Sequence, residues 1–311
     1  MKIASLLEDQ KIEKRISITP EVAKKYIELG FDVNIFENYG KHLGFEDKEY
    51  FDFGVKIIKD EKEIINNADI IIQLGLLNDS QISKLKPNQT VIGTLNPYEN
   101  RNKLEEIAKK KINLFSLELL PRITRAQSMD ILSSQANLAG YKAVIESFSI
   151  FKKAIPMMMT AAGTISAAKV LVVGAGVAGL QAIATAKRMG AIVFSTDVRL
   201  ASKEQVESLG GKFLVVEGSE NLETEGGYAK EASEEFKKKQ EELLSETLKK
   251  IDIVICTVAP PRHSTKQHAI RAALRTKISQ STNPKLSVFD VAHWHFPRYL
   301  DATRPIQCRL R

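Results

Sequence analysis

Short apolar segments alternate with amphipathic segments along the first 120 residues of the chain. The apolar segments are four to eight residues long and rich in Ile, Val, Leu or Phe, which is typical of buried strands. Six strands are predicted, at residues 2–7, 31–37, 55–58, 68–74, 90–95 and 112–119. Helical spacing appears between them, as at residues 20–30, which begin with proline and end with glycine. This alternation predicts an α/β domain with a parallel sheet over residues 1–125.

A long helical pattern at residues 128–153 leads away from this domain, and residues 126–164 are predicted to form an interdomain helix and linker. A second α/β pattern occupies residues 165–257. Its predicted strands are residues 169–173, a strand that ends at Asp197, residues 212–216 and residues 251–257. We therefore expect an α/β fold of two domains with parallel sheets, joined by a long helix.

A glycine-rich turn opens the second domain. Residues 174–179 read Gly-Ala-Gly-Val-Ala-Gly, a G-x-G-x-x-G pattern between an apolar strand and an apolar helix. Gly174 permits a tight turn, Gly176 lets the backbone approach a pyrophosphate, and Gly179 lets helix and strand pack closely. The following helix N-terminus offers N–H groups to phosphates. A plain glycine turn in an α/β sheet is the alternative, but the strand–turn–helix–strand context favours a dinucleotide site.

Asp197 closes the strand after this helix, where a carboxylate accepts hydrogen bonds from a ribose and repels a 2′-phosphate. This favours NAD(H) over NADP(H), although Arg199 is a residue type that binds a 2′-phosphate. The predicted cofactor-binding residues of the turn and the strand end are Gly174, Gly176, Val177, Ala178, Gly179, Asp197, Val198 and Arg199. Gly227 and Tyr228 suit a mobile flap over a nucleotide, and equally suit an ordinary loop before a helix.

Residues 121–130, PRITRAQSMD, follow the last predicted strand of the first domain. They fit either a charged helix start or a substrate-facing loop at a cleft between the domains. Gln127 carries the donor and the acceptor that complement a nicotinamide carboxamide. Asp130 and Arg122 suit either a mutual ion pair or the polar groups of a second dinucleotide. The dinucleotide turn downstream favours the functional interpretation.

The composition, with 43% hydrophobic and 27% charged residues, is that of a globular protein, and no apolar run approaches the ~20 residues of a membrane span. Two cysteines make no disulfide framework. The net charge of +7 is concentrated at the end of the chain, because residues 258–311 hold ten Lys or Arg and two Asp or Glu. The rest of the chain is close to neutral, which argues against a nucleic-acid-binding body.

Residues 258–311 differ from the rest in other ways, since they lack glycine and glutamate and prefer arginine over lysine. A reading-frame change in the coding sequence would produce such a shift. We expect this basic tail to carry no function, the second sheet to lack its last strands, and the strand at 251–257 to have an uncovered edge. A nucleic-acid-binding tail, or a metal site at His293 and His295, are weaker alternatives.

The residues of both domains resemble the NAD(H)-binding α subunit of proton-translocating NAD(P) transhydrogenases. The resemblance spans about residues 1–257 and rests on PRITRAQSMDILSSQANLAGYKAV, MMMTAAGT, VGAGVAGLQAIATAKRMGA, TDVR, SKEQVESLGGKF and GGYAKE. It implies two Rossmann-like domains in a homodimer, with hydride passing from NADH to NADP⁺ held on a β subunit. It also implies proton transfer through membrane-spanning partner segments and a cytoplasmic location against the inner membrane.

Carried over residue by residue, the resemblance assigns the hydride-transfer site to Arg122, Gln127, Asp130, Ser133 and Tyr141. It assigns the ribose carboxylate to Asp197 and the mobile-loop tyrosine to Tyr228. Such chemistry needs no metal and no nucleophile, because two nicotinamide rings must only meet with water excluded.

Alanine dehydrogenase is the nearest alternative enzyme, and the stretch EKRISITPE is common to both patterns. Its chemistry needs cationic groups for an amino-acid carboxylate and a histidine acid/base. Arg15 is present, but Gln73 stands where a lysine is expected, and the loop TLNPYEN has Asn96 in place of a histidine. An NAD-binding protein without catalytic activity is the other alternative.

Overall fold

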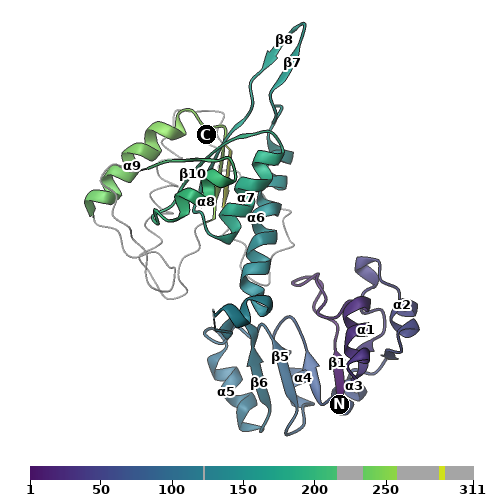
Figure 1. Cartoon of the computed structure of the whole chain (residues 1–311). Coiled ribbons are helices and arrows are strands. Elements are labelled where there is room, and N and C mark those ends of the chain that lie inside the picture. The colour runs from purple at the N-terminus through teal and green to yellow at the C-terminus, as the bar shows by residue number, and fades with distance from the viewer. Residues whose placement is uncertain (122, 216–233, 258–286, 291–311) are drawn as a thin grey trace. The chain divides into compact units, whose positions relative to one another are not determined.

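The structure is a computed structural model of the 311-residue chain, and it describes residues 1–121, 123–215, 234–257 and 287–290. Two compact units are present: Met1–Leu132, and the described residues from Ser133 onward. Figure 1 labels the helices and strands of both.

The first unit contains a six-stranded parallel sheet with the strand order β3-β2-β1-β4-β5-β6. Its strands are β1 (Lys2–Ser5), β2 (Asp32–Phe36), β3 (Lys56–Ile58), β4 (Ile70–Ile72), β5 (Thr90–Gly93) and β6 (Asn113–Ser116). Its helices are α1 (Pro20–Glu28), α2 (Asp47–Asp52), α3 (Glu61–Asn67), α4 (Asp79–Ser83) and α5 (Arg101–Lys109). Short 3-10 helices are η1 (Lys41–Leu43), η2 (Leu117–Leu119) and η3 (Thr124–Met129). The strand order is that of a doubly wound nucleotide-binding fold.

Local sequence explains where these helices begin. The side chain of Thr19 accepts a hydrogen bond from the backbone of Val22, and Pro20 opens α1. Asn78 and Gln81 form a reciprocal capping box at the start of α4. Each of these contacts satisfies backbone donors that the helix itself leaves unpaired.

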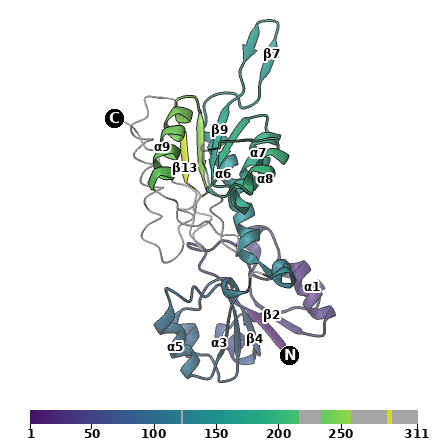
Figure 2. The same cartoon turned by 60° about the vertical axis from the view of Figure 1, so that its left-hand side comes forward.

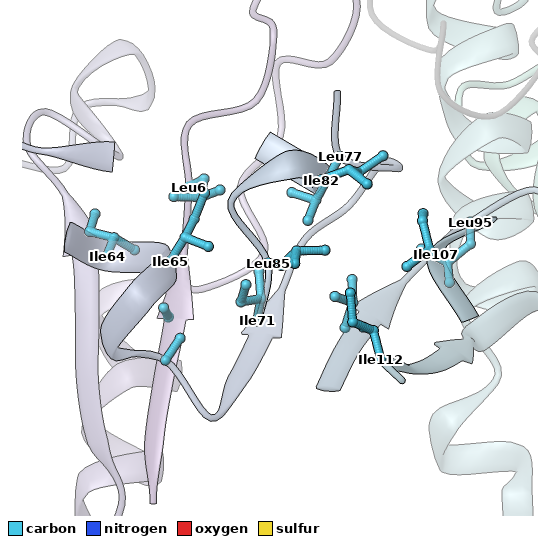
Figure 3. Packing of buried hydrophobic residues seen from close by; sticks show 13 residues of the cluster. Leu6, Ile64, Ile65, Ile71, Leu77, Ile82, Leu85, Leu95, Ile107 and Ile112 are labelled. Carbon is cyan, nitrogen blue, oxygen red and sulfur yellow. The ribbon is translucent and has the colours of Figure 1, made fainter. Parts of the chain in front are cut away.

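The core of this unit forms on the buried faces of the sheet. Figure 3 shows one apolar cluster, in which side chains from helices and loops meet those of the strands. Ile65 of α3, Ile71 of β4 and Ile107 of α5 are each at most 2% exposed. A second cluster surrounds Tyr39 and Tyr50, whose rings meet edge to face. The alternation of apolar strands and amphipathic helices therefore packs as the sequence predicts.

The second unit contains a five-stranded parallel sheet with the order β11-β10-β9-β12-β13. Its strands are β9 (Lys169–Val173), β10 (Ile192–Thr196), β11 (Lys212–Phe213), β12 (Ile253–Cys256) and β13 (Ser287–Asp290). Its helices are α6, which begins at the unit boundary (Ile131–Ile150), α7 (Val177–Arg188), α8 (Ser202–Ser208) and α9 (Glu234–Leu248). Both predicted parallel sheets are confirmed, and the long helix is α6.

The predicted open edge of β12 is wrong. β13 pairs with β12 in parallel register, with Ile253 opposite Ser287 and Cys256 opposite Asp290. β9 pairs with β12 on the other side, so β12 is an interior strand of the sheet. Residues 287–290 belong to the segment expected to contribute no strand to this sheet. Position along the chain did not reveal this pairing, because parallel strands meet only after a long crossover.

A β-hairpin that the sequence analysis did not predict follows α6. It consists of β7 (Met158–Thr160) and β8 (Gly163–Ile165), which pair in antiparallel fashion. Figures 1 and 2 both show it standing away from the rest of its unit. All six residues of its strands are exposed, including two methionines and an isoleucine. Among the helices that the structure describes, none has the length and apolar character required to cross a membrane.

Candidate functional site

The glycine turn connects the end of β9 to the start of α7. Gly174 has a φ of +94°, in the left-handed region that favours glycine. A Cβ atom on Gly179 would lie 1.9 Å from the carbonyl oxygen of Gly174, so only glycine permits this close packing. A Cβ on Gly176 would meet no atom within 4 Å, so the turn is open at that position. The conformational roles expected of Gly174 and Gly179 are confirmed, whereas contact with a nucleotide stays a prediction.

The N-terminus of α7 directly follows the open position of this turn. Gly176 is the N-cap residue, and it supplies no side-chain hydrogen bond to the helix. The first N–H groups of a helix have no partner within the helix, and they carry a partial positive charge. Val177 and Ala178 contribute two of these N–H groups, which are suited to phosphate oxygens.

Asp197 follows β10 directly and turns its carboxylate toward the glycine turn. The backbone N–H of Ala175 donates to Oδ2 of Asp197 at 2.7 Å. The backbone N–H of Arg199 donates to Oδ1 at 2.9 Å. The carboxylate is 8% exposed. Two backbone donors therefore hold it beside the turn, in the place where the fold family positions a ribose-binding acid.

The side chain of Arg199 folds back onto the same carboxylate. Its Nε donates to Oδ1 of Asp197 at 2.9 Å and its Nη2 donates to Oδ2 at 3.1 Å. Burial alone raises the pKa of Asp197, but the hydrogen bonds from Arg199 and Ala175 outweigh it and hold this pKa below its usual value. Asp197 is therefore ionised at neutral pH, and the guanidinium neutralises much of its charge.

Thr257 is a site residue that the sequence analysis missed. It follows β12, and its hydroxyl donates to the carbonyl oxygens of Gly174 at 2.9 Å and Val173 at 3.1 Å. The same hydroxyl oxygen lies 3.0 Å from the position of a Cβ on Gly179. A threonine at the carboxyl end of the strand next to β9 was the available signal, since these strand ends meet at one edge of the sheet.

Gly140 brings α6 against the start of α7 within the second unit. A Cβ on Gly140 would lie 2.1 Å from the carbonyl oxygen of Ala178 and 3.0 Å from its Cα. Two residues predicted for the site, Ser133 and Tyr141, lie on the same helix. Ser133 is half-buried, and Tyr141, next to Gly140, is 49% exposed. The helix that carries these two side chains thus packs on the dinucleotide turn.

Gln127 and Asp130 belong to the first unit, at its C-terminal end. Gln127 lies in η3 and is exposed, while Asp130 follows this 3-10 helix and is half-buried. The N–H of Asp130 donates to the carbonyl oxygen of Gln127 at 3.2 Å, which closes the turn before α6. Their contact with a nicotinamide stays a prediction. Arg122, Gly227 and Tyr228 lie outside the described residues.

The residues weighed for alanine dehydrogenase chemistry have partners of their own. The amide of Gln73 is 4% exposed and brackets the backbone of Leu6, accepting from its N–H at 3.1 Å and donating to its carbonyl at 3.2 Å. Arg15 forms an ion pair with the buried Glu13 at 2.6 Å. The side chain of Asn96 donates to Glu99. Gln73 thus joins the segments that follow β1 and β4, which is a structural role.

Comparisons with known proteins cover both units. The family described as alanine dehydrogenase/PNT matches with its N-terminal domain over residues 6–139 and with its C-terminal domain over residues 143–275. The chain is 51% identical over 265 residues to an NAD(P) transhydrogenase subunit alpha of Rickettsia prowazekii, across 84% of this chain and 69% of that protein. The family match extends beyond residue 257, where the resemblance was expected to end.

Solved structures agree. The crystal structure of transhydrogenase from Sinorhizobium meliloti superposes with a TM-score of 0.73 at 43% identity, over 84% of this chain and 70% of that one. An L-alanine dehydrogenase superposes with the same TM-score at 17% identity, over 94% of this chain and 74% of that one, which is a likeness of fold alone.

Proposed function

The chain belongs to the alanine dehydrogenase/PNT family, and on that premise we propose that it is the NAD(H)-binding subunit of an NAD(P) transhydrogenase. In this proposal, hydride passes directly from NADH on this chain to NADP⁺ on a partner subunit. The transfer is coupled to proton translocation through membrane-spanning partner segments. The chain then acts at the cytoplasmic face of the inner membrane, to which its partners attach it.

The observation that carries this proposal is the juxtaposition of the glycine turn and the carboxylate of Asp197. The turn is open at Gly176, the N-terminus of α7 has no side-chain cap, and Asp197 is held beside it by the N–H of Ala175. A diphosphate needs N–H donors and a ribose needs an ionised acceptor, so these residues fit the two ends of an adenosine diphosphate. Both halves of NAD(H) recognition by the chain's own groups are therefore accounted for on the adenosine side.

On the nicotinamide side we assign the roles expected from the sequence. Gln127 complements the carboxamide, Arg122 and Asp130 orient charged or amide groups, and Ser133 and Tyr141 line the ring. Gly227 and Tyr228 close over the nucleotide. NADH supplies the hydride when it is bound, and the chain's residues bind, orient and exclude water. None of these residues needs to give or take a proton.

The projecting hairpin supports a homodimer. Met159 is 71% exposed, Met158 is 48% exposed and Ile165 is 51% exposed. Exposed apolar side chains on a two-stranded sheet are unfavourable in water and are suited to an interface. A twofold interface places the same hairpin of each copy on its partner, so one feature is used twice.

An alanine dehydrogenase is the weaker proposal. Gln73 is committed to the backbone of Leu6, and Arg15 is paired with Glu13, so neither stands ready for an amino-acid carboxylate. Asn96 lacks the proton-transfer capacity of a histidine. No described residue therefore favours oxidative deamination over hydride exchange.

Two measurements test the proposed function. The first is titration with NADH and NADPH, in which Asp197→Ala should weaken NADH binding by roughly 1–3 kcal/mol. Equal or tighter binding of NADPH by the unaltered protein would contradict the assignment. The second combines the chain with the NADP-binding and membrane subunits of a transhydrogenase and follows the transfer of deuterium from labelled NADH to NADP⁺.

Variants of the loop in the first unit separate orientation from affinity. Gln127→Asn and Asp130→Asn should slow deuterium transfer by more than they weaken NADH binding, because alignment of the ring affects the barrier. The exposed helix residue Asn137 offers a control in Asn137→Ala. If transfer rates are unchanged in both loop variants, PRITRAQSMD is a charged helix start. Reduction of NAD⁺ by alanine, at a rate comparable with hydride exchange, would favour the dehydrogenase instead.

A further inference from the structure

The carboxylate of Asp197 accepts four hydrogen bonds within the protein. Oδ1 accepts from the backbone N–H and from Nε of Arg199, each at 2.9 Å. Oδ2 accepts from the backbone N–H of Ala175 at 2.7 Å and from Nη2 of Arg199 at 3.1 Å. An ionised carboxylate has about four lone-pair positions. The acceptor capacity that a ribose diol requires is therefore used by the protein itself.

The four donors differ in how easily they leave. The N–H of Ala175 is part of the glycine turn, and the N–H of Arg199 follows Asp197 by two residues, so both move only with the backbone. The guanidinium lies at the end of a long rotatable side chain that is 21% exposed. Displacement of the guanidinium frees one position on each oxygen, and the two backbone donors still hold the carboxylate in place.

We propose that Arg199 is a displaceable internal competitor for the adenosine-ribose subsite, and that nucleotides with an unmodified 2′,3′-diol bind by replacing its guanidinium on Asp197. This inference rests on the proposed function. It assigns Arg199 a specificity role different from that of a 2′-phosphate clamp. Arg199 lowers the affinity for NADH, because its charge-assisted bonds must break before the ribose bonds form.

The displaced guanidinium also remains close to the ribose, because Arg199 lies only two residues from Asp197. There its positive charge offsets part of the repulsion between Asp197 and a 2′-phosphate. Removal of the guanidinium therefore has opposite effects on the two dinucleotides. NADH should bind more tightly, since its competitor is gone, and NADPH should bind more weakly, since the carboxylate is no longer compensated. General damage to the site would weaken both.

The test uses the full chain and its Arg199→Met variant, which keeps length but removes the donors, titrated at pH 7.5 with NADH, NADPH and 5′-AMP. Arg199→Met should bind NADH and 5′-AMP roughly two- to tenfold more tightly and NADPH more weakly. Arg199→Lys, which keeps the charge without the bidentate fork, should fall between. Arg188→Met, at the exposed end of α7, is the matched control and should bind all three like the unaltered protein.

Unchanged or weaker NADH binding by Arg199→Met, with unaltered NADH binding by the natural chain, would overturn the competitor role alone. Failure of every protein to bind NADH and 5′-AMP would overturn the proposed function and this inference with it. If Arg199→Met does not fold, the arginine Nε–H resonance of the unaltered chain decides. NADH should shift the Arg199 signal and speed its exchange with water, and an undisturbed signal in the saturated complex would overturn the inference.

Discussion

The hydroxyl of Thr257 donates to the carbonyl oxygen of Gly174 at 2.9 Å, which ties the end of β12 to the first residue of the glycine turn. Gly174 is in the left-handed region, where no regular hydrogen-bond pattern orients its carbonyl. A single side chain from a distant strand therefore holds the turn in the shape that leaves Gly176 open. The dinucleotide turn thus depends on a residue that is 83 positions away in the chain.

We expect Thr257→Val to weaken NADH binding by about 0.5–1.5 kcal/mol, because the variant keeps the shape of the side chain and removes the donor. Titration of NADH measures the effect. Thr247→Val is the matched control, since Thr247 also donates its hydroxyl to a backbone carbonyl, that of Leu243, within α9. Equal losses of NADH affinity in both variants would contradict a local role of Thr257 in the turn.

Gly140→Ala should destabilise the protein, although alanine favours an isolated helix over glycine. The added methyl group would lie 2.1 Å from the carbonyl oxygen of Ala178, so α6 and α7 must move apart. Overpacking of this kind costs about 1–3 kcal/mol of the free energy of unfolding, and denaturant unfolding measures it. Asn137→Ala, on an exposed position of α6, should be neutral or stabilising. A stabilising Gly140→Ala would show that the two helices do not pack as the structure has them.

The contribution of Asp197 to stability should depend on pH in one direction. Its pKa is lower in the folded protein than the usual 3.8, so its ionised form stabilises the fold above about pH 4. This stabilisation is lost as the pH falls through the folded-state pKa. Asp197→Asn should therefore lower the free energy of unfolding by roughly 1–3 kcal/mol at pH 7, and the gap should shrink below pH 4.

Denaturant unfolding of both proteins at pH 7, 5 and 3.5 measures this gap. Asp79→Asn is a suitable control, because Asp79 is 93% exposed and its ion pair with Lys103 lies on the surface. A gap for Asp197→Asn that widens toward pH 3.5 would have the wrong sign and would contradict the ionised pair with Arg199.

Met159→Lys should convert the proposed homodimer to monomers. The residue is 71% exposed on the hairpin, and a charge buried at an interface without a partner is strongly unfavourable. Sedimentation velocity at several concentrations measures the oligomeric state. Met189→Lys, at the C-terminal end of α7 and 39% exposed, should leave it unchanged. A dimer that survives Met159→Lys and the further change Met158→Lys would place the interface elsewhere.

A chain that ends after Thr257 should be less stable than the full chain, by about 1–3 kcal/mol, because it loses the β13 pairing and exposes one edge of β12. This expectation reverses the one drawn from composition alone. Thermal unfolding of both proteins, with binding of 5′-AMP as a check of the remaining site, provides the comparison. Equal midpoints would show that β13 contributes nothing to the sheet.

The elements whose signals are local could be predicted from the amino-acid sequence. Strand and helix alternate in a period that the burial of both sheet faces imposes, and the predicted elements correspond to those of both units. The glycine turn and Asp197 could also be predicted, because left-handed backbone at Gly174 and close packing at Gly179 each demand a specific residue type. These features depend on neighbours in the chain, so a short stretch of sequence carries all the information that they need.

Contacts between distant segments became visible only in the folded chain. Composition set residues 258–311 apart, yet β13 completes the sheet beside β12, since backbone hydrogen bonds between strands are nearly independent of residue type. The partners of Arg199, Thr257 and Gly140 depend on which strand ends and helices meet at one edge of the second sheet. The hairpin at residues 158–165 escaped prediction because its exposed methionines break the alternation that marks a strand. Long-range pairing, unlike helix period or turn chemistry, leaves no signature within any one segment.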